Sequence, residues 1–395
     1  MKYSILTIAG APLFAVALPL PAQPMPGQSP IAMAPATPPA PVPNDIPVAL
    51  LIDLSSGQTL FARNADTRFV PASVTKVMSI YTAFKLMGAG KLSPDTIVTV
   101  SKDIGDTWGG KGSSMLLKTG DRVTIGQLVL GISTVSGNDA AVTLATYVAG
   151  SLENWVAMMN ANAAELGMRN SHFGMPNGWM DEGHTYVSAN DLATLANAMV
   201  TRYPELYSRY IGHKRMTYNG VTQVNHDPIT GVVPGADGIK TGYTRQAGYT
   251  FLGSADRGGR RLVLVIGAAP TPADRNHTAR DLIEWGFSAF HTRELVPVDA
   301  TVGSARVQDG ADMRVPLQTD LPVLASASGP PPKPTLSIRY RGPVEAPIKQ
   351  GQQIADLHVV VPGQQPHDVP LVAAYDVPKA NAWQRLRNGI VGLFT

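Results

Sequence analysis

The sequence contains no cysteine among its 395 residues. Disulfide bonds and thiolate metal sites are therefore excluded, and the absence of cysteine is compatible with an oxidising compartment without establishing one. Charged residues are also scarce, at 15 % of the chain, and the formal net charge of +3 includes no basic block. Proteins that bind nucleic acids carry such blocks, so we expect no nucleic-acid partner.

Histidines with the spacing of metal ligands are absent as well. The residues that fail to form such a pattern are His172, His184, His213, His226 and His277. We interpret them as core or loop residues, and we expect no metal and no other cofactor.

Long hydrophobic runs are missing except at the N-terminus. There an apolar run from Tyr3 to about Leu20 follows a short charged start and precedes small residues, which predicts an exported protein with a signal peptide over residues 1–22. An uncleaved membrane anchor fits less well, because three prolines interrupt the run. The next segment, residues 23–46, is rich in Pro and Ala, and we expect a leader that lies outside any packed core.

The remaining chain is long enough for two domains with different patterns. Residues 47–294 combine strands at both ends with helical periodicity between them, which predicts an α+β domain with an antiparallel sheet and a helical cluster. Residues 295–378 alternate short β-like runs with Gly/Pro turns, as in a small all-β domain. Residues 379–395 form an amphipathic segment, whose apolar side chains share one helical face: Trp383, Leu386, Ile390, Leu393 and Phe394.

A serine and a lysine stand three residues apart at the start of a predicted buried helix that ends at Gly88. Ser73 and Lys76 share one face at this spacing, so the lysine amine can reach the serine hydroxyl. An adjacent base turns serine into an effective nucleophile. The pattern alone is common, and most copies are helix caps beside a solvated lysine.

Two further motifs follow in order, Ser136-Gly137-Asn138 and Lys240-Thr241-Gly242. This ordered triple is typical of serine β-lactamases and penicillin-binding proteins. Two other stretches match by chance: Lys118-Thr119-Gly120 is interpreted as a polar turn, and Ser188-Ala189-Asn190 as a helix cap.

From about residue 47 to the end, the chain closely resembles the low-molecular-mass D-alanyl-D-alanine carboxypeptidases, the penicillin-binding proteins of serine peptidase family S11. The stretches that carry the resemblance are residues 71–78, 135–140, 175–178, 237–244 and 285–287, with echoes of a C-terminal β domain at 346–351 and 369–373. Trp179 and Met180 stand where the family usually has Leu and a polar residue, and we expect no effect of these departures on the chemistry.

The resemblance implies a β-lactamase/penicillin-binding-protein-like transpeptidase fold, followed by the small all-β domain. In the catalytic set, Ser73 would attack the carbonyl between two terminal D-alanines, Lys76 would take its proton, and Ser136 would relay a proton to the departing amine. Lys76 must then be neutral near pH 7, and both burial and the charge of Lys240 would lower its pKa.

The resemblance also implies a substrate-binding set. Asn138 would hold a backbone amide of the substrate, and the N–H groups of Ser73 and Tyr243 would bind the oxyanion. Thr241 and Arg275 would hold the terminal carboxylate, with Lys240 and Gly242 of the same motif beside them. For Arg275 the alternative is a surface salt bridge.

The implied partners are peptidoglycan stem peptides ending in D-Ala-D-Ala, β-lactams, and a membrane surface bound by the C-terminal helix. The implied location is the periplasm, with peripheral attachment to the cytoplasmic membrane; a tail helix packed on the β domain is the alternative. Three other functions stay open: a β-lactamase, a D,D-endopeptidase, or a cell-wall-binding protein with an idle site. The C-terminal domain and the lack of a convincing Glu-bearing loop weigh against the β-lactamase.

Overall fold

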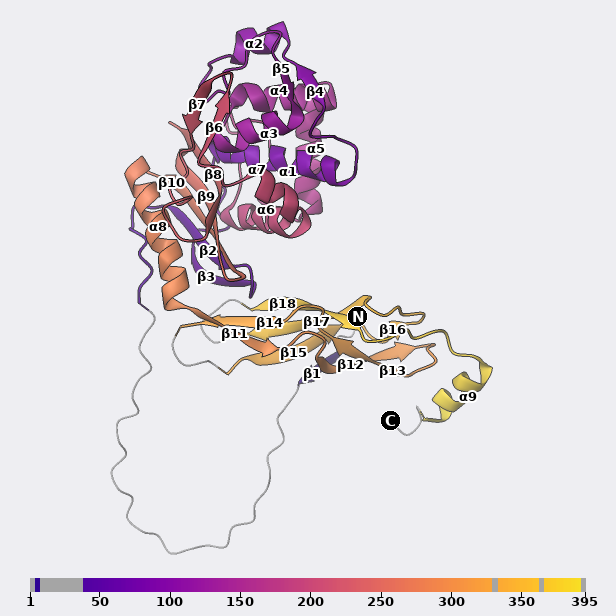
Figure 1. Ribbon diagram of the computed structural model, residues 1–395. Helices are drawn as coiled ribbons and strands as arrows, with labels where there is room; N and C mark the ends of the chain where they lie inside the picture. Colours follow the sequence, from indigo (N-terminus) through magenta and orange to yellow (C-terminus); the bar gives the residue numbers. More distant parts are fainter. Residues whose placement is uncertain (1–3, 8–37, 329–332, 362–365, 392–395) are drawn as a thin grey trace, which may run out of the picture. The chain divides into compact units, whose positions relative to one another are not determined.

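The computed structural model describes residues 4–7, 38–328, 333–361 and 366–391 (Figure 1). Contacts divide the chain into two compact units, a catalytic unit of residues 39–55 and 59–288 and a β unit that includes residues 56–58 and the described residues from Ala289 onward. The division follows Ser288, whereas we expected it after residue 294. The strand β11 (His291–Val296) explains this difference, because it pairs with β14 (Val323–Ala327) of the β unit.

The catalytic unit contains a five-stranded antiparallel sheet with the order β3-β2-β10-β9-β8. Its strands are β2 (Val48–Asp53), β3 (Gln58–Arg63), β8 (Ala236–Thr244), β9 (Gly248–Arg257) and β10 (Arg260–Ala269). The strands expected at both ends of residues 47–294 are thereby confirmed. The strands β2 and β10, from opposite ends of the unit's sequence, lie side by side, because Val48 pairs with Gly267 and Asp53 pairs with Leu262.

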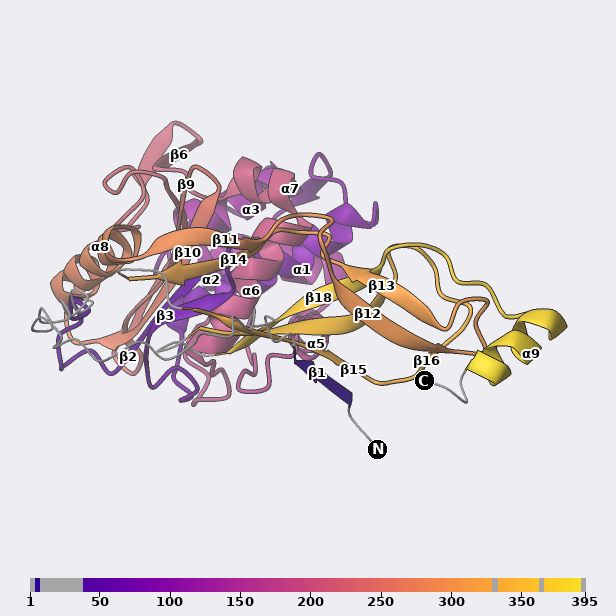
Figure 2. The same cartoon turned by 90° about the horizontal axis from the view of Figure 1, so that it is seen from below.

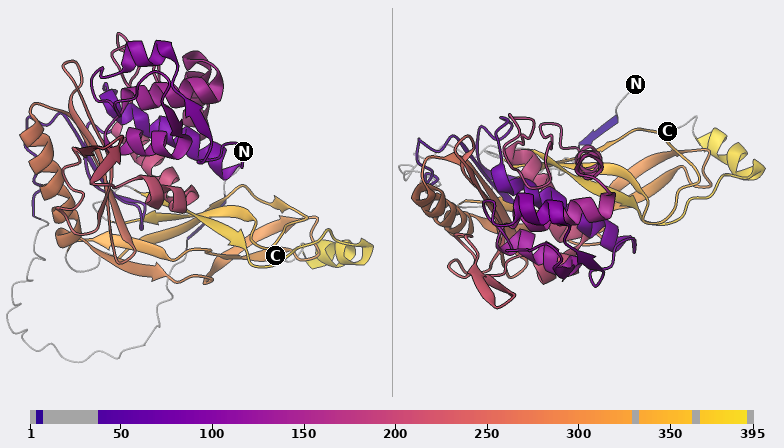
Figure 3. Two further views of the ribbon diagram at one scale, coloured as in Figure 1. Left: turned by 45° about the horizontal axis from the view of Figure 1, so that its top comes forward. Right: turned by 90° about the horizontal axis from the view of Figure 1, so that it is seen from above.

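Both faces of the inner strands β2 and β10 are buried, and alternate residues of these two strands face different cores. Leu50 and Val263 belong to the core on one face, whereas Leu51 and Leu264 belong to the core on the other. The helix α8 (Pro272–Ala289) covers the second face, and the helical cluster covers the first (Figures 1, 2 and 3). The helices of the cluster are α1 (Lys76–Gly88), α3 (Ile125–Thr134), α4 (Asn138–Ala149), α5 (Leu152–Glu165), α6 (Ala189–Arg202) and α7 (Pro204–Tyr210). The α+β architecture predicted from the sequence is therefore confirmed.

Short elements surround the cluster. They are α2 (Lys102–Trp108), the strand pair β4 (Ile97–Thr99) and β5 (Arg122–Thr124), and the hairpin of β6 (Arg215–Tyr218) and β7 (Val221–Val224). The capping box at Thr124 and Gln127 starts α3, because each side chain accepts a hydrogen bond from the other residue's backbone N–H.

The end of the Pro/Ala-rich leader corrects one expectation. Val42 and Ile46 are buried in the core under α8, although we expected residues 23–46 to lie outside any core. The Arg63 guanidinium donates hydrogen bonds to backbone carbonyls of this segment, including that of Ile46 at 3.0 Å. Two apolar side chains four positions apart in a proline-containing segment were too weak a signal to identify this packing. Residues 23–37 of the predicted leader lie outside the described residues.

The β unit contains a seven-stranded sheet with the order β1-β15-β17-β18-β13-β12-β16, together with the β11–β14 pair (Figure 1). Its remaining strands are β1 (Ser4–Thr7), β12 (Thr301–Gln308), β13 (Arg314–Gln318), β15 (Thr335–Tyr340), β16 (Val344–Glu345), β17 (Gln353–Val360) and β18 (His367–Ala373). In β17 buried and half-buried residues alternate, and Ala355, Leu357 and Val359 face an apolar core. The predicted all-β domain is thereby confirmed.

The two chain ends bear on predictions that remain open. β1 lies within residues 1–22 and pairs with β15, so cleavage of the predicted signal peptide would remove this edge strand. At the other end, the helix α9 (Ala382–Val391) covers most of the predicted amphipathic segment; Leu393 and Phe394 lie outside the described residues.

Candidate active site

The nucleophile candidate lies on a tight turn just before the first long helix. Residues Ala72–Thr75 form a 3₁₀ helix and α1 begins at Lys76, whereas we expected Ser73 inside the first turn of α1 itself. A 3₁₀ helix has three residues per turn, so side chains at i and i+3 eclipse each other more closely than in an α-helix. The Ser73 Oγ and Lys76 Nζ atoms accordingly lie 2.9 Å apart.

Lys76 is fully buried, and its amine has two further partners. The Nζ atom lies 2.8 Å from Asn138 Oδ1 and 2.6 Å from the backbone carbonyl of Asn177. Burial lowers the pKa of Lys76 well below its usual value; the charge of Lys240 lowers it further, and Asp139 opposes the shift. A neutral amine donates to these two oxygens and keeps a lone pair for the Ser73 proton.

Ser136 lies on the turn between α3 and α4, and Asn138 is the first residue of α4. Asn138 bridges two segments, because its Oδ1 accepts from Lys76 and its Nδ2 donates to the Lys111 carbonyl at 2.9 Å. Ser136 has a positive φ of 60°, and its buried Oγ has no hydrogen-bond partner among the described residues. A buried hydroxyl without a partner is costly, and a substrate group would satisfy it.

Asp139 is a structural residue of the site to which sequence reasoning assigned no role. Its fully buried carboxylate accepts hydrogen bonds from the backbone N–H groups of Met115 and Leu117 and from the Ser114 hydroxyl. These bonds fix the strand-like segment that passes Asn138. An acidic residue directly after the Ser-Gly-Asn motif was the available signal.

Asn177 and Gly178 also contribute to the site, although we inferred no role for them from the sequence. The Asn177 carbonyl accepts from Lys76, and its Oδ1 accepts from the Trp179 backbone N–H at 3.0 Å. Gly178 has a φ of +67°, and a Cβ atom there would lie 1.9 Å from the Ala72 carbonyl oxygen. Trp179 is thus hydrogen-bonded to Asn177, which is a partner of Lys76. The tryptophan that replaces the usual Leu therefore lies closer to the reacting groups than we expected.

The third motif lies on β8, at the edge of the sheet beside the serine turn. A Cβ atom on Gly242 would lie 2.5 Å from the Pro71 carbonyl oxygen and 3.1 Å from the Ser73 nitrogen. The Thr250 hydroxyl of the neighbouring strand donates to the same Pro71 carbonyl at 2.9 Å. Glycine at 242 therefore lets the strand approach the serine backbone.

Lys240 is buried beside two other charged groups. Its Nζ donates to the Thr241 carbonyl at 2.8 Å, and burial together with the charge of Arg275 lowers its pKa to about 7. Asp227 opposes this shift. Arg275 is itself 7 % exposed, so the surface salt bridge considered as its alternative is wrong; its guanidinium is bound by Asn276 Oδ1 at 2.8 Å.

Tyr243 is half exposed and stacks on Tyr249, with ring centroids 4.2 Å apart. Arg275 lies 5.9 Å from the centre of the Tyr249 ring. The expected binding residues Lys240, Thr241, Gly242 and Tyr243 are therefore consecutive on one strand, and Tyr249 links this strand to Arg275.

The two chance matches take the positions expected for them. Lys118 is exposed on a turn that closes with a hydrogen bond from the Asp121 N–H to its carbonyl. Ser188 caps α6, because its Oγ accepts from the Asp191 N–H at 3.2 Å.

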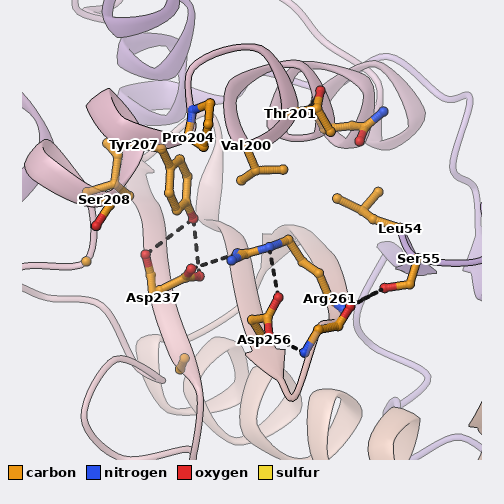
Figure 4. Close-up of a pocket in the computed structure, with 15 residues that line it drawn as sticks. Leu54, Ser55, Val200, Thr201, Pro204, Tyr207, Ser208, Asp237, Asp256 and Arg261 are labelled. Atoms are coloured by element: carbon orange, nitrogen blue, oxygen red, sulfur yellow. Dashed lines mark hydrogen bonds and ion pairs between the residues drawn. The ribbon is translucent and has the colours of Figure 1, made fainter. Parts of the chain in front are cut away.

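A separate cavity of about 510 Å³ adjoins the start of β8 (Figure 4). Arg261 lines it and binds Asp237 at 2.7 Å, and the Tyr207 hydroxyl donates to Asp237 from α7. Asp237 comes three residues before Lys240, so this ion pair fixes the beginning of the strand that carries the third motif. None of the nine expected site residues lines the cavity.

The site combines a serine–lysine pair on one turn, a serine with an unpartnered hydroxyl on a second turn, and a strand that carries a lysine beside the nucleophile. This combination defines the penicillin-binding transpeptidase-like class of serine acyl-transfer enzymes. Family models agree with this class: residues 38–271 match the D-alanyl-D-alanine carboxypeptidases of peptidase family S11, and residues 290–379 match the C-terminal domain of penicillin-binding protein 5. The chain belongs to this family, and it is a serine-type D-Ala-D-Ala carboxypeptidase of peptidoglycan processing.

Individual relatives show the same similarity. The chain is 34 % identical to the D-alanyl-D-alanine carboxypeptidase DacA of Escherichia coli strain K12, over 87 % of each chain. The crystal structure of penicillin-binding protein 5 from Haemophilus influenzae superposes with a TM-score of 0.73 at 29 % identity, over 85 % of this chain and 98 % of that one. The structure of penicillin-binding protein D2 from Listeria monocytogenes in its ampicillin-bound form has a TM-score of 0.57 at 26 % identity, over 64 % of this chain and all of that one.

Proposed function

We propose that Ser73 is the nucleophile of this carboxypeptidase and that Lys76 is its general base. The observation that carries this proposal is the 2.9 Å contact between Ser73 Oγ and the buried, pKa-lowered amine of Lys76. The amine takes the hydroxyl proton while Ser73 Oγ bonds to the carbonyl carbon between the two D-alanines. The C–N bond then breaks, and water hydrolyses the resulting ester.

The departing D-alanine needs a proton on its amine, and Ser136 relays it. Its buried, unpartnered hydroxyl supports this role. The developing oxyanion accepts hydrogen bonds from the N–H groups of Ser73 and Tyr243. The close approach of Gly242 to the Ser73 nitrogen supports a site between these two backbone segments.

Recognition of a free C-terminal carboxylate falls to Lys240, Thr241 and Arg275. Burial lowers the pKa of both cations, the charge of Arg275 lowers that of Lys240 further, and an incoming carboxylate would relieve this repulsion. Asn138 holds the substrate amide through the second hydrogen of its Nδ2, since the first is bound by Lys111. A carboxylate site of this kind suits the free carboxylate of a terminal D-alanine.

Covalent β-lactam binding follows from the same acylation step. The Listeria protein to which this chain is similar has been solved in an ampicillin-bound form. We propose that β-lactams acylate Ser73 here in the same manner as the peptide substrate.

Hydrolysis of a pentapeptide ending in D-Ala-D-Ala, followed by mass spectrometry, tests this function. We expect the loss of one alanine from the pentapeptide and little cleavage of a cross-linked dimer. Ser73→Ala should abolish the reaction, and Lys240→Met should weaken it, whereas Lys118→Met changes the exposed lysine of the chance Lys-Thr-Gly match and serves as the control. Preferred cleavage of the cross-link would favour the D,D-endopeptidase instead, and binding of peptidoglycan without either product would favour the idle site.

We further propose that α9 attaches the protein peripherally to the cytoplasmic membrane from the periplasm. The polar side of α9 is held by the β unit, because the Arg387 guanidinium donates to the Ala311 carbonyl and Asn388 to that of Gly310. Trp383 and Leu386 are 80 % and 58 % exposed. Exposed apolar side chains on a helix anchored by its other side suit an interfacial location. The helices in the described ranges include none that is both long and apolar enough to span a bilayer.

Sedimentation with anionic vesicles tests the attachment. Deletion of residues 381–395 should release the protein and leave hydrolysis of a soluble peptide unchanged. Continued sedimentation of the truncated protein would contradict the proposal.

A further inference from the structure

A lysine between two tryptophans lies beside the substrate-amide residue Asn138. The Lys111 Nζ atom is 4.7 Å from the ring centre of Trp108 and 5.0 Å from that of Trp179. The two indoles meet edge to face, with centroids 5.6 Å apart and an interplanar angle of 88°. We refer to Trp108, Lys111 and Trp179 as the Trp–Lys cluster.

The position of the Trp–Lys cluster follows from two contacts with Asn138. The Lys111 carbonyl accepts from Asn138 Nδ2 at 2.9 Å. A Cβ atom on Gly112 would lie 2.9 Å from both Asn138 Nδ2 and the Trp179 ring, so only a glycine separates the indole from the amide. Because Asn138 also contacts Lys76, the cluster lies one residue beyond the reacting centre.

The Trp–Lys cluster offers two kinds of surface. Trp108 is almost fully buried and supports the half-buried ring of Trp179, which provides an apolar face. Lys111 is exposed, and no carboxylate of the described part of the chain forms an ion pair with it. A group that satisfies both surfaces has an aliphatic stem and ends in a carboxylate.

We propose that the Trp–Lys cluster is a specificity subsite for the acyl side of the substrate. It selects peptides in which the residue before the two D-alanines carries an aliphatic side chain ending in a carboxylate. This inference rests on the proposed role of Asn138: once Asn138 holds the amide between that residue and the penultimate D-alanine, the side chain extends toward Gly112. The stem then packs on Trp179, and the carboxylate pairs with Lys111.

Three soluble tripeptides, N-acetyl-Xaa-D-Ala-D-Ala, separate charge from shape. Xaa is 2-aminoadipate, its uncharged isostere norleucine, or lysine. We expect kcat/KM to fall in this order, with about a threefold to fivefold advantage of aminoadipate over norleucine, as is typical of an exposed ion pair. The advantage of aminoadipate should shrink in about 0.5 M salt, because salt screens the attraction between exposed charges.

Two variants locate the preference. Lys111→Met should remove the difference between aminoadipate and norleucine, whereas the control Lys91→Met, at another exposed lysine, should retain it. Trp179→Leu should lower kcat/KM for both peptides about fivefold relative to N-acetyl-Gly-D-Ala-D-Ala, which lacks the stem.

Equal wild-type rates for the three tripeptides, or a preference that survives Lys111→Met, would overturn the subsite. Those outcomes leave the proposed function intact, because D-alanine is still released through Ser73. A wild-type protein that releases D-alanine from none of the peptides, or Ser73→Ala that still does so, would overturn the proposed function instead.

Discussion

The two units of the chain both bury apolar cores, but they differ in what else they bury. In the described ranges, every charged side chain with almost no solvent exposure belongs to the catalytic unit: Asp53, Lys76, Asp139, Asp191, Lys240 and Arg275. The core of the β unit consists of Val, Leu, Ile and Ala side chains. Burying a charge costs several kcal/mol unless partners compensate it.

This difference separates the chemistry from the scaffold. Asp139 is compensated by three backbone N–H groups and a hydroxyl, and it serves the geometry of the site. Lys76 and Lys240 are compensated less completely, so their pKa values fall. Burial of these two amines thus lowers the stability of the catalytic unit relative to a neutral core, and one of the two amines becomes a base.

The largest expected effect is the loss of that base. Lys76→Met keeps the length of the side chain but removes the proton acceptor, and general-base contributions are typically ~10²–10⁴-fold in rate. Stopped-flow acylation by a fluorescent penicillin measures the change. Lys85→Met, on the same helix but part-exposed and paired with Glu165, is the matched control and should acylate at the wild-type rate. Near wild-type acylation of Lys76→Met would show that Lys76 is not the base.

A core substitution in the β unit should have the opposite profile. Leu357 is fully buried on β17, and Leu357→Ala should destabilise this unit by about 2–5 kcal/mol. Activity of the folded protein should stay at its wild-type level, because no expected site residue belongs to the β unit. Chemical denaturation and peptide hydrolysis at low denaturant measure the two effects, with the exposed Leu321→Ala as control. A fall in kcat of the folded variant would contradict the separation of the units' roles.

Lys240 should change the pH profile in a defined direction. Its charge lowers the pKa of Lys76, so Lys240→Met should raise that pKa and move the acid limb of kcat/KM to higher pH. The alkaline limb should also change. Wild-type Lys240 has a pKa of about 7, so it loses its charge above neutrality and then binds the substrate carboxylate less well. The variant has no amine at this position and should therefore lack this alkaline limb. The two amines interact, so the wild-type limbs report the pair. An acid limb that stays in place would show that Lys240 does not act on Lys76.

The smallest expected effect concerns the tail. Leu386→Ser removes one exposed apolar side chain from α9, and partial burial of a leucine contributes roughly 1 kcal/mol, or about fivefold in vesicle partitioning. Leu321→Ser, at another exposed leucine of the same unit, should leave partitioning unchanged. Equal losses for both variants would indicate a nonspecific surface effect.

The sequence predicted those parts of the site that depend on local spacing. Ser73 and Lys76 meet because they are three residues apart on one turn, and strand β2 is a continuous apolar run because both of its faces are buried. Even there, the local form differed, since the turn is 3₁₀ and not α-helical.

The parts that the sequence did not reveal depend on contacts between distant segments. The Asn177 carbonyl approaches Lys76 across 101 residues, and a backbone carbonyl has no residue type to identify it. Trp179 meets Lys111 only because Gly112 passes between the indole and Asn138. A single sequence contains the residues of such a contact but not their proximity.

The proposed mechanism depends most on which serine is acylated. Peptide mapping by mass spectrometry after brief exposure to a β-lactam measures this directly, on the wild-type protein and on Ser73→Ala. We predict a single adduct on Ser73 and none in the variant, because only Ser73 lies within hydrogen-bond reach of the Lys76 amine among the described serines. An adduct on Ser136, or labelling that survives Ser73→Ala, would contradict the assignment.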